Sequence, residues 1–162
     1  MLKIWTNTEP LRTYADGFEE LGNICVDAKG NLIATDRGSG RVFMLNKSTE
    51  KPEHIAGNGK GKNGAKKSDP KQRALEGVRA VWPTPDGGLL LGCHEGDDIY
   101  YLSPSNTISK LIDGSKNIHE GDGTDIKSGK KISETRSVTL DYNGNIIICE
   151  HDGGFIRMVE KK

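Results

Sequence analysis

A segment that recurs three times, at an interval of 57 residues, constrains this chain more than any other feature. Each copy contains a turn, a short apolar run, a polar glycine-rich loop and a second apolar run. Equivalent residues in the three copies are Gly30, Gly87 and Gly144, then Leu32, Leu89 and Ile146, then Val42, Ile99 and Ile156. Similarity at a fixed interval predicts a fold built from equivalent units that pack against one another.

Each unit predicts four short strands. The first strand, at 24–26, 81–82 or 138–140, ends in a glycine-containing turn of the kind that tight hairpins demand. The second strand, at 32–34, 89–91 or 146–148, is continuously apolar, so we expect neighbouring units to cover both of its faces. The third strand occupies 42–45, 99–102 or 156–159. The fourth, at 53–56 or 110–113, is more polar and suits an outer edge.

The N-terminal residues follow the same pattern, since 2–5 and 13–17 match a third and a fourth strand. The chain therefore predicts sheets of two, four, four and three strands and no helix. Four-stranded units repeated around an axis are the blades of a β-propeller. We expect an all-β fold, a partial β-propeller over 1–162 with about three blades, or half of a six-bladed ring. The divisions are a part blade at 1–17, blades at 18–57 and 75–114, and a part blade at 133–162.

About three blades are too few to close a ring, because propellers have about four to eight. Two explanations stay open at this point. The chain is part of a longer six-bladed protein, or two copies form a homodimer that completes six blades. In either case an isolated chain exposes sheet faces that are made for neighbours.

Composition and charge exclude several kinds of partner. The 23 basic and 23 acidic residues give a formal net charge of zero, so we expect neither nucleic acid nor a membrane surface as partner. The basic connection at 58–74 has no interleaved aromatic residues to stack on bases. Three widely spaced cysteines and the lack of a secretory signal in this sequence predict a cytoplasmic location by default.

The candidate site follows from strand direction. Strands alternate in direction, so the loops after each second strand and before each first strand share one face. We expect a protein or small-molecule ligand to bind there, at Asp36, Arg37, His94, Glu95, His119, Glu120, Glu150 and His151. We expect no organic cofactor. A divalent ion (Ca²⁺, Mg²⁺ or Zn²⁺) is the alternative, with His94, Glu95, Glu150 and His151 as ligands. The same imidazoles and carboxylates could serve as an acid–base pair for hydrolysis.

Two stretches carry a resemblance to known families. Ile-Ala-Gly-Asn-Gly-Lys-Gly at 55–61, with Asp-Tyr-Asn-Gly-Asn-Ile at 141–146 and Ile-Arg-Met-Val at 156–159, resembles NHL-repeat propellers. The segment 139–151 is also similar to the SMP-30/gluconolactonase-like family. The first resemblance implies a binding scaffold, and the second implies a metal-dependent lactone or ester hydrolase. This sequence departs from the hydrolase pattern at Arg136, which stands where that family has a metal-binding Asn.

Overall fold

The structure is a computed structural model that describes residues 2–4, 11–49, 51–59, 61–127 and 129–161. The described residues form thirteen strands and one short 3₁₀ helix, η1 (Pro70–Gln72). The all-β prediction is confirmed, and η1 is the single exception to the expected lack of helix. No helix in these residues has both the length and the apolar character needed to span a membrane.

The strands fall into four antiparallel sheets, in which each strand pairs with its neighbours in the chain. The first sheet contains β1 (Leu2–Ile4) and β2 (Arg12–Ala15). The second contains β3 (Leu21–Val26), β4 (Leu32–Asp36), β5 (Arg41–Leu45) and β6 (Pro52–Ala56). The third contains β7 (Val78–Pro83), β8 (Leu89–Cys93), β9 (Ile99–Leu102) and β10 (Ile108–Ile112). The fourth contains β11 (Thr135–Leu140), β12 (Ile146–Glu150) and β13 (Ile156–Val159).

The first strand of each of the three units begins three residues earlier than the apolar pattern predicted. The additional residues include Gly22, Arg79 and Arg136, which are small or charged and so gave no strand signal. In all three strands the pairing register shifts at this point, between Leu21 and Ile24, Val78 and Ala80, or Thr135 and Ser137. Such bulges bend a strand and change the direction of its side chains.

The turns between first and second strands repeat in detail. Gly30 and Gly144 have φ of 82° and 84°, a left-handed conformation that glycine adopts without a steric penalty. In the first and third of these turns an aspartate, Asp27 or Asp141, accepts hydrogen bonds from the backbone N–H groups two and four residues further on. Thr84 stands at the equivalent position in the second turn. Equivalent turns with equivalent hydrogen bonds explain why the hairpins of different units have the same shape.

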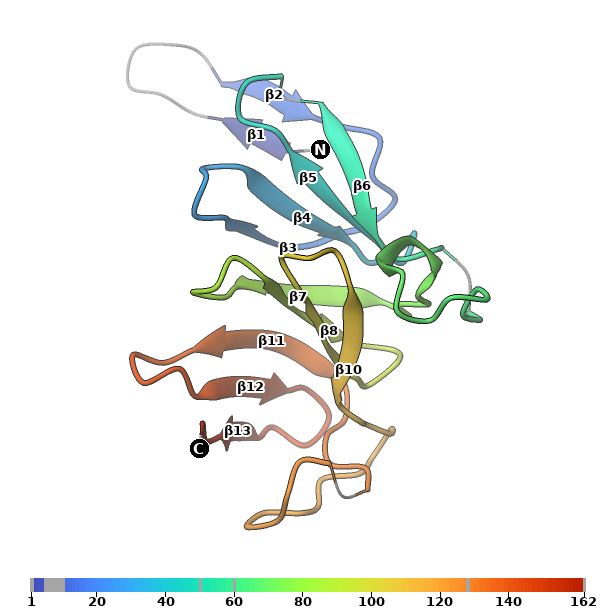
Figure 1. Cartoon of the computed structure of the whole chain (residues 1–162), viewed down its shortest axis with the longest axis vertical. Coiled ribbons are helices and arrows are strands. Elements are labelled where there is room, and N and C mark those ends of the chain that lie inside the picture. The colour runs from blue at the N-terminus through green and yellow to red at the C-terminus, as the bar shows by residue number, and fades with distance from the viewer. Residues whose placement is uncertain (1, 5–10, 50, 60, 128, 162) are drawn as a thin grey trace.

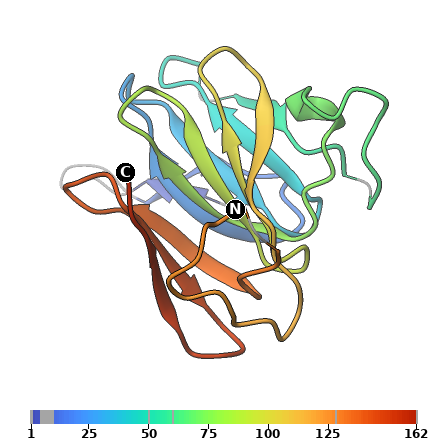
Figure 2. The same ribbon diagram turned by 60° about the horizontal axis from the view of Figure 1, so that its bottom comes forward.

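The sheets stack face to face in chain order, with the first and last sheets at opposite ends (Figure 1, Figure 2). One apolar cluster joins the second and third sheets, and another joins the third and fourth. The middle strand β8 lies between these clusters, so Leu89, Leu90 and Leu91 are only 7 %, 2 % and 0 % exposed. The prediction that neighbouring units cover both faces of this strand is therefore confirmed.

The second and fourth sheets expose apolar side chains. Ile24 and Val26 of β3 alternate with Cys25, which packs towards the third sheet, so they lie on the opposite face. In the fourth sheet, Ile156 and Met158 of β13 are 79 % and 53 % exposed. A further blade would cover these surfaces, whether it belongs to the same chain or to a second copy. The homodimer stays a prediction.

The hydroxyl group of Thr35 connects two blades, and its removal tests their packing. The side chain is fully buried, accepts the Asn23 N–H at 2.9 Å and donates to the Arg79 carbonyl oxygen of the next sheet at 2.7 Å. We expect Thr35→Val to lower the free energy of unfolding by about 1–3 kcal/mol, because both groups lose a buried partner. Urea denaturation measures the change. Thr139→Val, on an inner strand with a longer hydroxyl contact of 3.5 Å, should change it by less than about 0.5 kcal/mol. Equal effects would contradict the proposed connection.

Candidate functional site

The connections that follow the second strands and precede the first strands gather on one side of the stack, at the right in Figure 1. Contacts between different blades establish this face. Arg37, after β4, donates from Nε to Glu95 Oε1, after β8, at 2.8 Å, and its Nη2 pairs with the same oxygen. Arg37 also pairs with Glu20 at 2.5 Å. A hollow lies beside this pair, lined by Glu20, Arg37, Gly77 and Glu95 among others.

Three side chains from three different connections form the first cluster on this face: His94, Glu134 and His151. Their ligand atoms all lie within 4.8 Å of one another. Glu134 Oε2 is 2.9 Å from His151 Nδ1 and 3.7 Å from His94 Nε2, and the imidazole centroids are 5.9 Å apart. His94 is the buried member of the cluster, whereas the His151 side chain is 53 % exposed.

His94 has an unusual environment for a polar side chain. The residue is 9 % exposed, and among the described residues neither ring nitrogen has a hydrogen-bond partner. Its Nδ1 lies 3.3 Å from Glu95 Oε1, without the alignment of a hydrogen bond. The backbone N–H of His94 donates to the Gly77 carbonyl oxygen at 3.0 Å, which holds the residue in place. Buried polar atoms normally have a partner, so these two nitrogens require an explanation.

The backbone of Glu134 is held in a strained conformation. Its φ of 43° lies in the left-handed region, which costs a non-glycine residue free energy. Two contacts hold it there: the Glu134 N–H donates to Asp97 Oδ1 at 2.7 Å, and its carbonyl oxygen accepts the His151 N–H at 3.1 Å. Burial, with a contribution from the nearby Asp152 and Glu134 charges, raises the pKa of Asp97. Strain held in this way is typical of functional positions.

The second cluster contains His119, Glu150 and Asp152, and its polar atoms are largely paired. His119 Nδ1 lies 2.6 Å from Glu150 Oε2, and its Nε2 lies 3.4 Å from Asp152 Oδ1. Glu150 is completely buried at its side chain and is also 2.5 Å from Arg157 Nε. Ser133 joins the two acids, with its N–H donating to Glu150 and its hydroxyl to Asp152. Partial burial raises the pKa of Asp152, but the Ser133 hydrogen bond and the His119 charge outweigh it and leave the pKa below its usual value.

The structure divides the metal-ligand set expected from the sequence. His94 and His151 lie together, as their spacing of one repeat indicated, but Glu150 lies with His119. Glu95 is paired with Arg37, and its pKa is low because the Arg37 hydrogen bonds and charge outweigh the effect of burial. Sequence reasoning missed Glu134, which lies in the connection between β10 and β11. That connection has no counterpart of similar sequence in the other units, so the repeat gave no signal for it.

Two other candidate residues have different positions. Asp36 is buried and accepts hydrogen bonds from the N–H groups of Glu19 and Glu20 and from the Ser39 hydroxyl, so it holds the connection before β3. The Glu120 side chain is exposed, and the carbonyl oxygen of the residue accepts a long bond from Arg157. Neither residue belongs to the two clusters.

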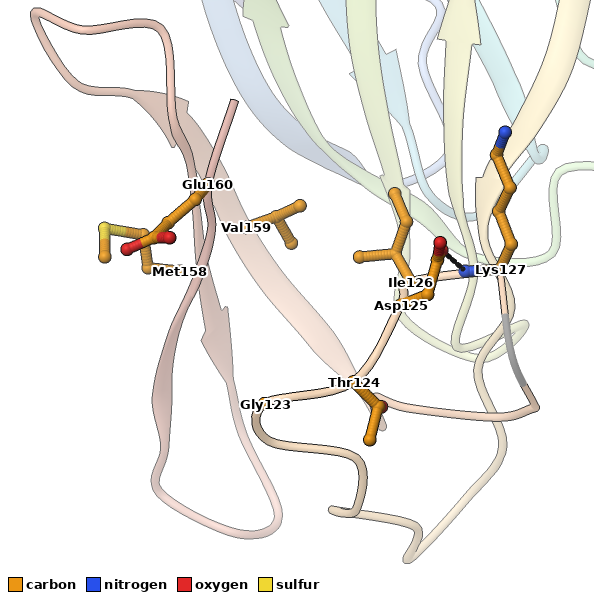
Figure 3. A pocket seen from close by; sticks show the side chains of 8 residues that line it. All are labelled: Gly123, Thr124, Asp125, Ile126, Lys127, Met158, Val159 and Glu160. Atoms are coloured by element: carbon orange, nitrogen blue, oxygen red, sulfur yellow. Dashed lines mark hydrogen bonds between the residues drawn. The ribbon is translucent and has the colours of Figure 1, made fainter. Parts of the chain in front are cut away.

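A second hollow lies between the segment 123–127 and the end of β13 (Figure 3). Ile126, Met158 and Val159 line it, together with polar residues of the connection. It contains no imidazole and lies against the last sheet of the stack. The two groups of side chains that could hold a metal ion lie outside this hollow.

Comparison with known proteins supports the fold. No known protein family and no curated protein matches this sequence. Similar solved structures include a Bacteroides thetaiotaomicron protein of unknown function (TM-score 0.73, 14% identity, 94% of this chain and 40% of that one). They also include virginiamycin B lyase from Staphylococcus aureus (TM-score 0.62, 10% identity), where the match covers 96% of this chain and 47% of that one. A third, provisionally named a gluconolactonase, has a TM-score of 0.55 and 14% identity, and the match covers 98% of this chain and 66% of that one.

These relatives are propeller-type proteins, and the chain has the fold of consecutive propeller blades. The chain spans less than half the length of the first two structures. At these sequence identities the structural similarity establishes the fold alone, so any argument about function depends on the residues of the site.

The three hydrogen bonds to Asp36 predict a pH-dependent contribution to stability. Burial raises the pKa of this carboxyl, but the bonds from Glu20, Ser39 and Glu19 outweigh it and lower the pKa below the usual value. A lowered pKa in the folded state stabilises the fold above the unfolded pKa of about 3.9, and this contribution is lost as the pH falls. We expect Asp36→Asn to destabilise the protein by about 1–3 kcal/mol at pH 7.

Denaturation at pH 7 and at pH 3 checks this expectation. The difference between the wild type and Asp36→Asn should shrink on acidification. Asp16→Asn, at an exposed position, should have little effect at either pH. A difference for Asp36→Asn that stays constant with pH would contradict the role given to the ionised carboxylate.

Proposed function

We propose that this propeller segment is a binding scaffold of NHL type. Its loop-rich face holds a divalent transition-metal ion at His94, Glu134 and His151, and a small polar ligand binds through that ion. The observation that carries the proposal is the buried imidazole of His94, whose two ring nitrogens have no hydrogen-bond partner among the described residues. Burying a polar group without a partner costs free energy, and a metal ion would remove that cost at Nε2.

The distances suit a first-row metal. With metal–ligand bonds of about 2.0–2.1 Å, the ligand atoms of a tetrahedral zinc ion lie about 3.3 Å apart. Glu134 Oε2 lies 2.9 Å from His151 Nδ1 and 3.7 Å from His94 Nε2, and these two distances fall on either side of that value. Two imidazoles favour zinc over Ca²⁺ and Mg²⁺, which prefer oxygen ligands. Three protein ligands leave one position open for water or for the bound molecule, and the exposed His151 lies on the open side.

The second cluster is less suited to a metal. Both nitrogens of His119 already face carboxylates, and Glu150 lies against the cation of Arg157. A metal ion there would have to displace these contacts. We propose that this cluster supports the face by fixing the loop that carries His151.

Titration of metal-free protein with zinc, followed by calorimetry, tests the proposal. We expect one tightly bound ion per chain, and a loss of affinity of more than about tenfold for His151→Ala and for Glu134→Gln. His119→Ala is the matched control and should retain the ion. Loss of zinc in His119→Ala with retention in His151→Ala would move the metal to the second cluster. Absence of stoichiometric binding would overturn the proposal.

The alternative function is a metal-dependent lactone or ester hydrolase. The open fourth position of the proposed metal ion favours it, because a zinc-bound water is a common nucleophile in hydrolysis. We expect zinc-loaded protein to hydrolyse gluconolactone no faster than buffer containing free zinc. Hydrolysis above that background, abolished by His151→Ala and retained by His119→Ala, would replace the binding function with the enzymatic one.

A further inference from the structure

The bulge in the first strand of each unit carries an arginine in two of the three cases. Arg79 of β7 and Arg136 of β11 are separated by one repeat, and their strands lie next to each other. The equivalent position in β3 is Gly22, which has no side chain and packs against the Arg79 backbone. The two arginines thus stand at equivalent positions of adjacent strands, and the charge of Arg136 acts on Arg79.

These two arginines have no acidic partner of their own. Within the described part of the chain, neither side chain makes a hydrogen bond or an ion pair, and Arg136 Nε is buried. The acids that act on Arg79, Glu20 and Glu95, are both already paired with Arg37. Burial, followed by the charges of Arg136 and Arg37, lowers the pKa of Arg79. Positive charge that is partly removed from water and not neutralised costs free energy, which a bound anion would recover.

The arginine pair lies close to the proposed metal site. Arg136 is two residues after Glu134, which lies between His94 and His151. On the other side, the charges of Arg37 and Glu95 act on Arg79, and Glu95 Oε1 contacts both Arg37 and the His94 ring. A ligand held by the two arginines would therefore lie at the same face as the open metal position.

We infer that Arg79 and Arg136 form a recognition site for an oxyanion, a carboxylate or a phosphate group of the bound molecule. The planar guanidinium group matches both groups through paired hydrogen bonds. The inference specifies the ligand of the function proposed above as anionic. It rests on that function for its biological meaning, but anion binding itself does not require the metal.

Calorimetric titration of the protein in a buffer with an uncharged metal chelator, which cannot compete as an anion, tests the site alone. Inorganic phosphate is one probe and malonate, a dicarboxylate, is the other. We expect binding of at least one of them, weakened by salt, and weakened by about tenfold or more in Arg136→Gln and in Arg79→Gln, because each loses charge-assisted hydrogen bonds. Arg136→Lys keeps the charge without the paired geometry and should be intermediate. Arg12→Gln, in the first sheet, is the control and should bind within about twofold of the wild type.

The two probes identify the class of anion, since binding of phosphate alone indicates a phosphate ligand and binding of malonate indicates a carboxylate. A rise in the melting temperature of the wild type with the anion gives an independent measurement if a variant fails to fold. Failure of both probes to bind, or unchanged binding in Arg79→Gln and Arg136→Gln, would overturn the inference. Because the chelator removes metal, these outcomes are separate from the zinc titration, which decides the metal site.

Discussion

The face-to-face packing of successive sheets is the constraint on which this structure depends. Strand β8 is apolar at every position and lies between two other sheets, so its side chains are shielded from water on both faces of the sheet. At about 25 cal/mol per Å² of buried apolar surface, this packing is the main source of stability for sheets of only two to four strands. A unit removed from the stack would expose the apolar side chains that now pack against its neighbours.

The same packing determines which side chains can meet. Each blade presents its loops on one side, and neighbouring blades place loops of equivalent position next to each other. His94 and His151 approach each other because β8 and β12 hold equivalent places in adjacent sheets, and Arg79 and Arg136 do so because β7 and β11 are neighbours. Functional groups thus come in pairs related by the repeat, and a residue from a long connection, Glu134, completes one of these pairs.

Some polar side chains on this face are hydrogen-bonded within the protein and support its loops, whereas others have nitrogen atoms available to a ligand. Asp36, Glu150 and Asp152 accept several hydrogen bonds each and hold their loops in place. Among the described residues, His94 and Arg136 have buried nitrogen atoms with no hydrogen-bond partner. Glu150 Oε1 and Arg157 Nε also lack one, but these two atoms form an ion pair with each other. A folded protein tolerates few such atoms, and the two ring nitrogens of His94 and Nε of Arg136 belong to groups that bind metals and anions.

The sequence by itself determined the strand order, the hairpin turns, the face that carries the loops and the pairing of His94 with His151. It could do so because these features follow from the periodicity of apolar residues and turn glycines, which the backbone obeys in every unit. Only the tertiary structure decided that Glu95 pairs with Arg37, that Glu150 lies with His119 and that Asp36 holds a loop. It also revealed Glu134 and the bulges at Arg79 and Arg136. Side-chain partners depend on how neighbouring blades and unrepeated connections pack in space, and periodicity along the chain contains no information about those distances.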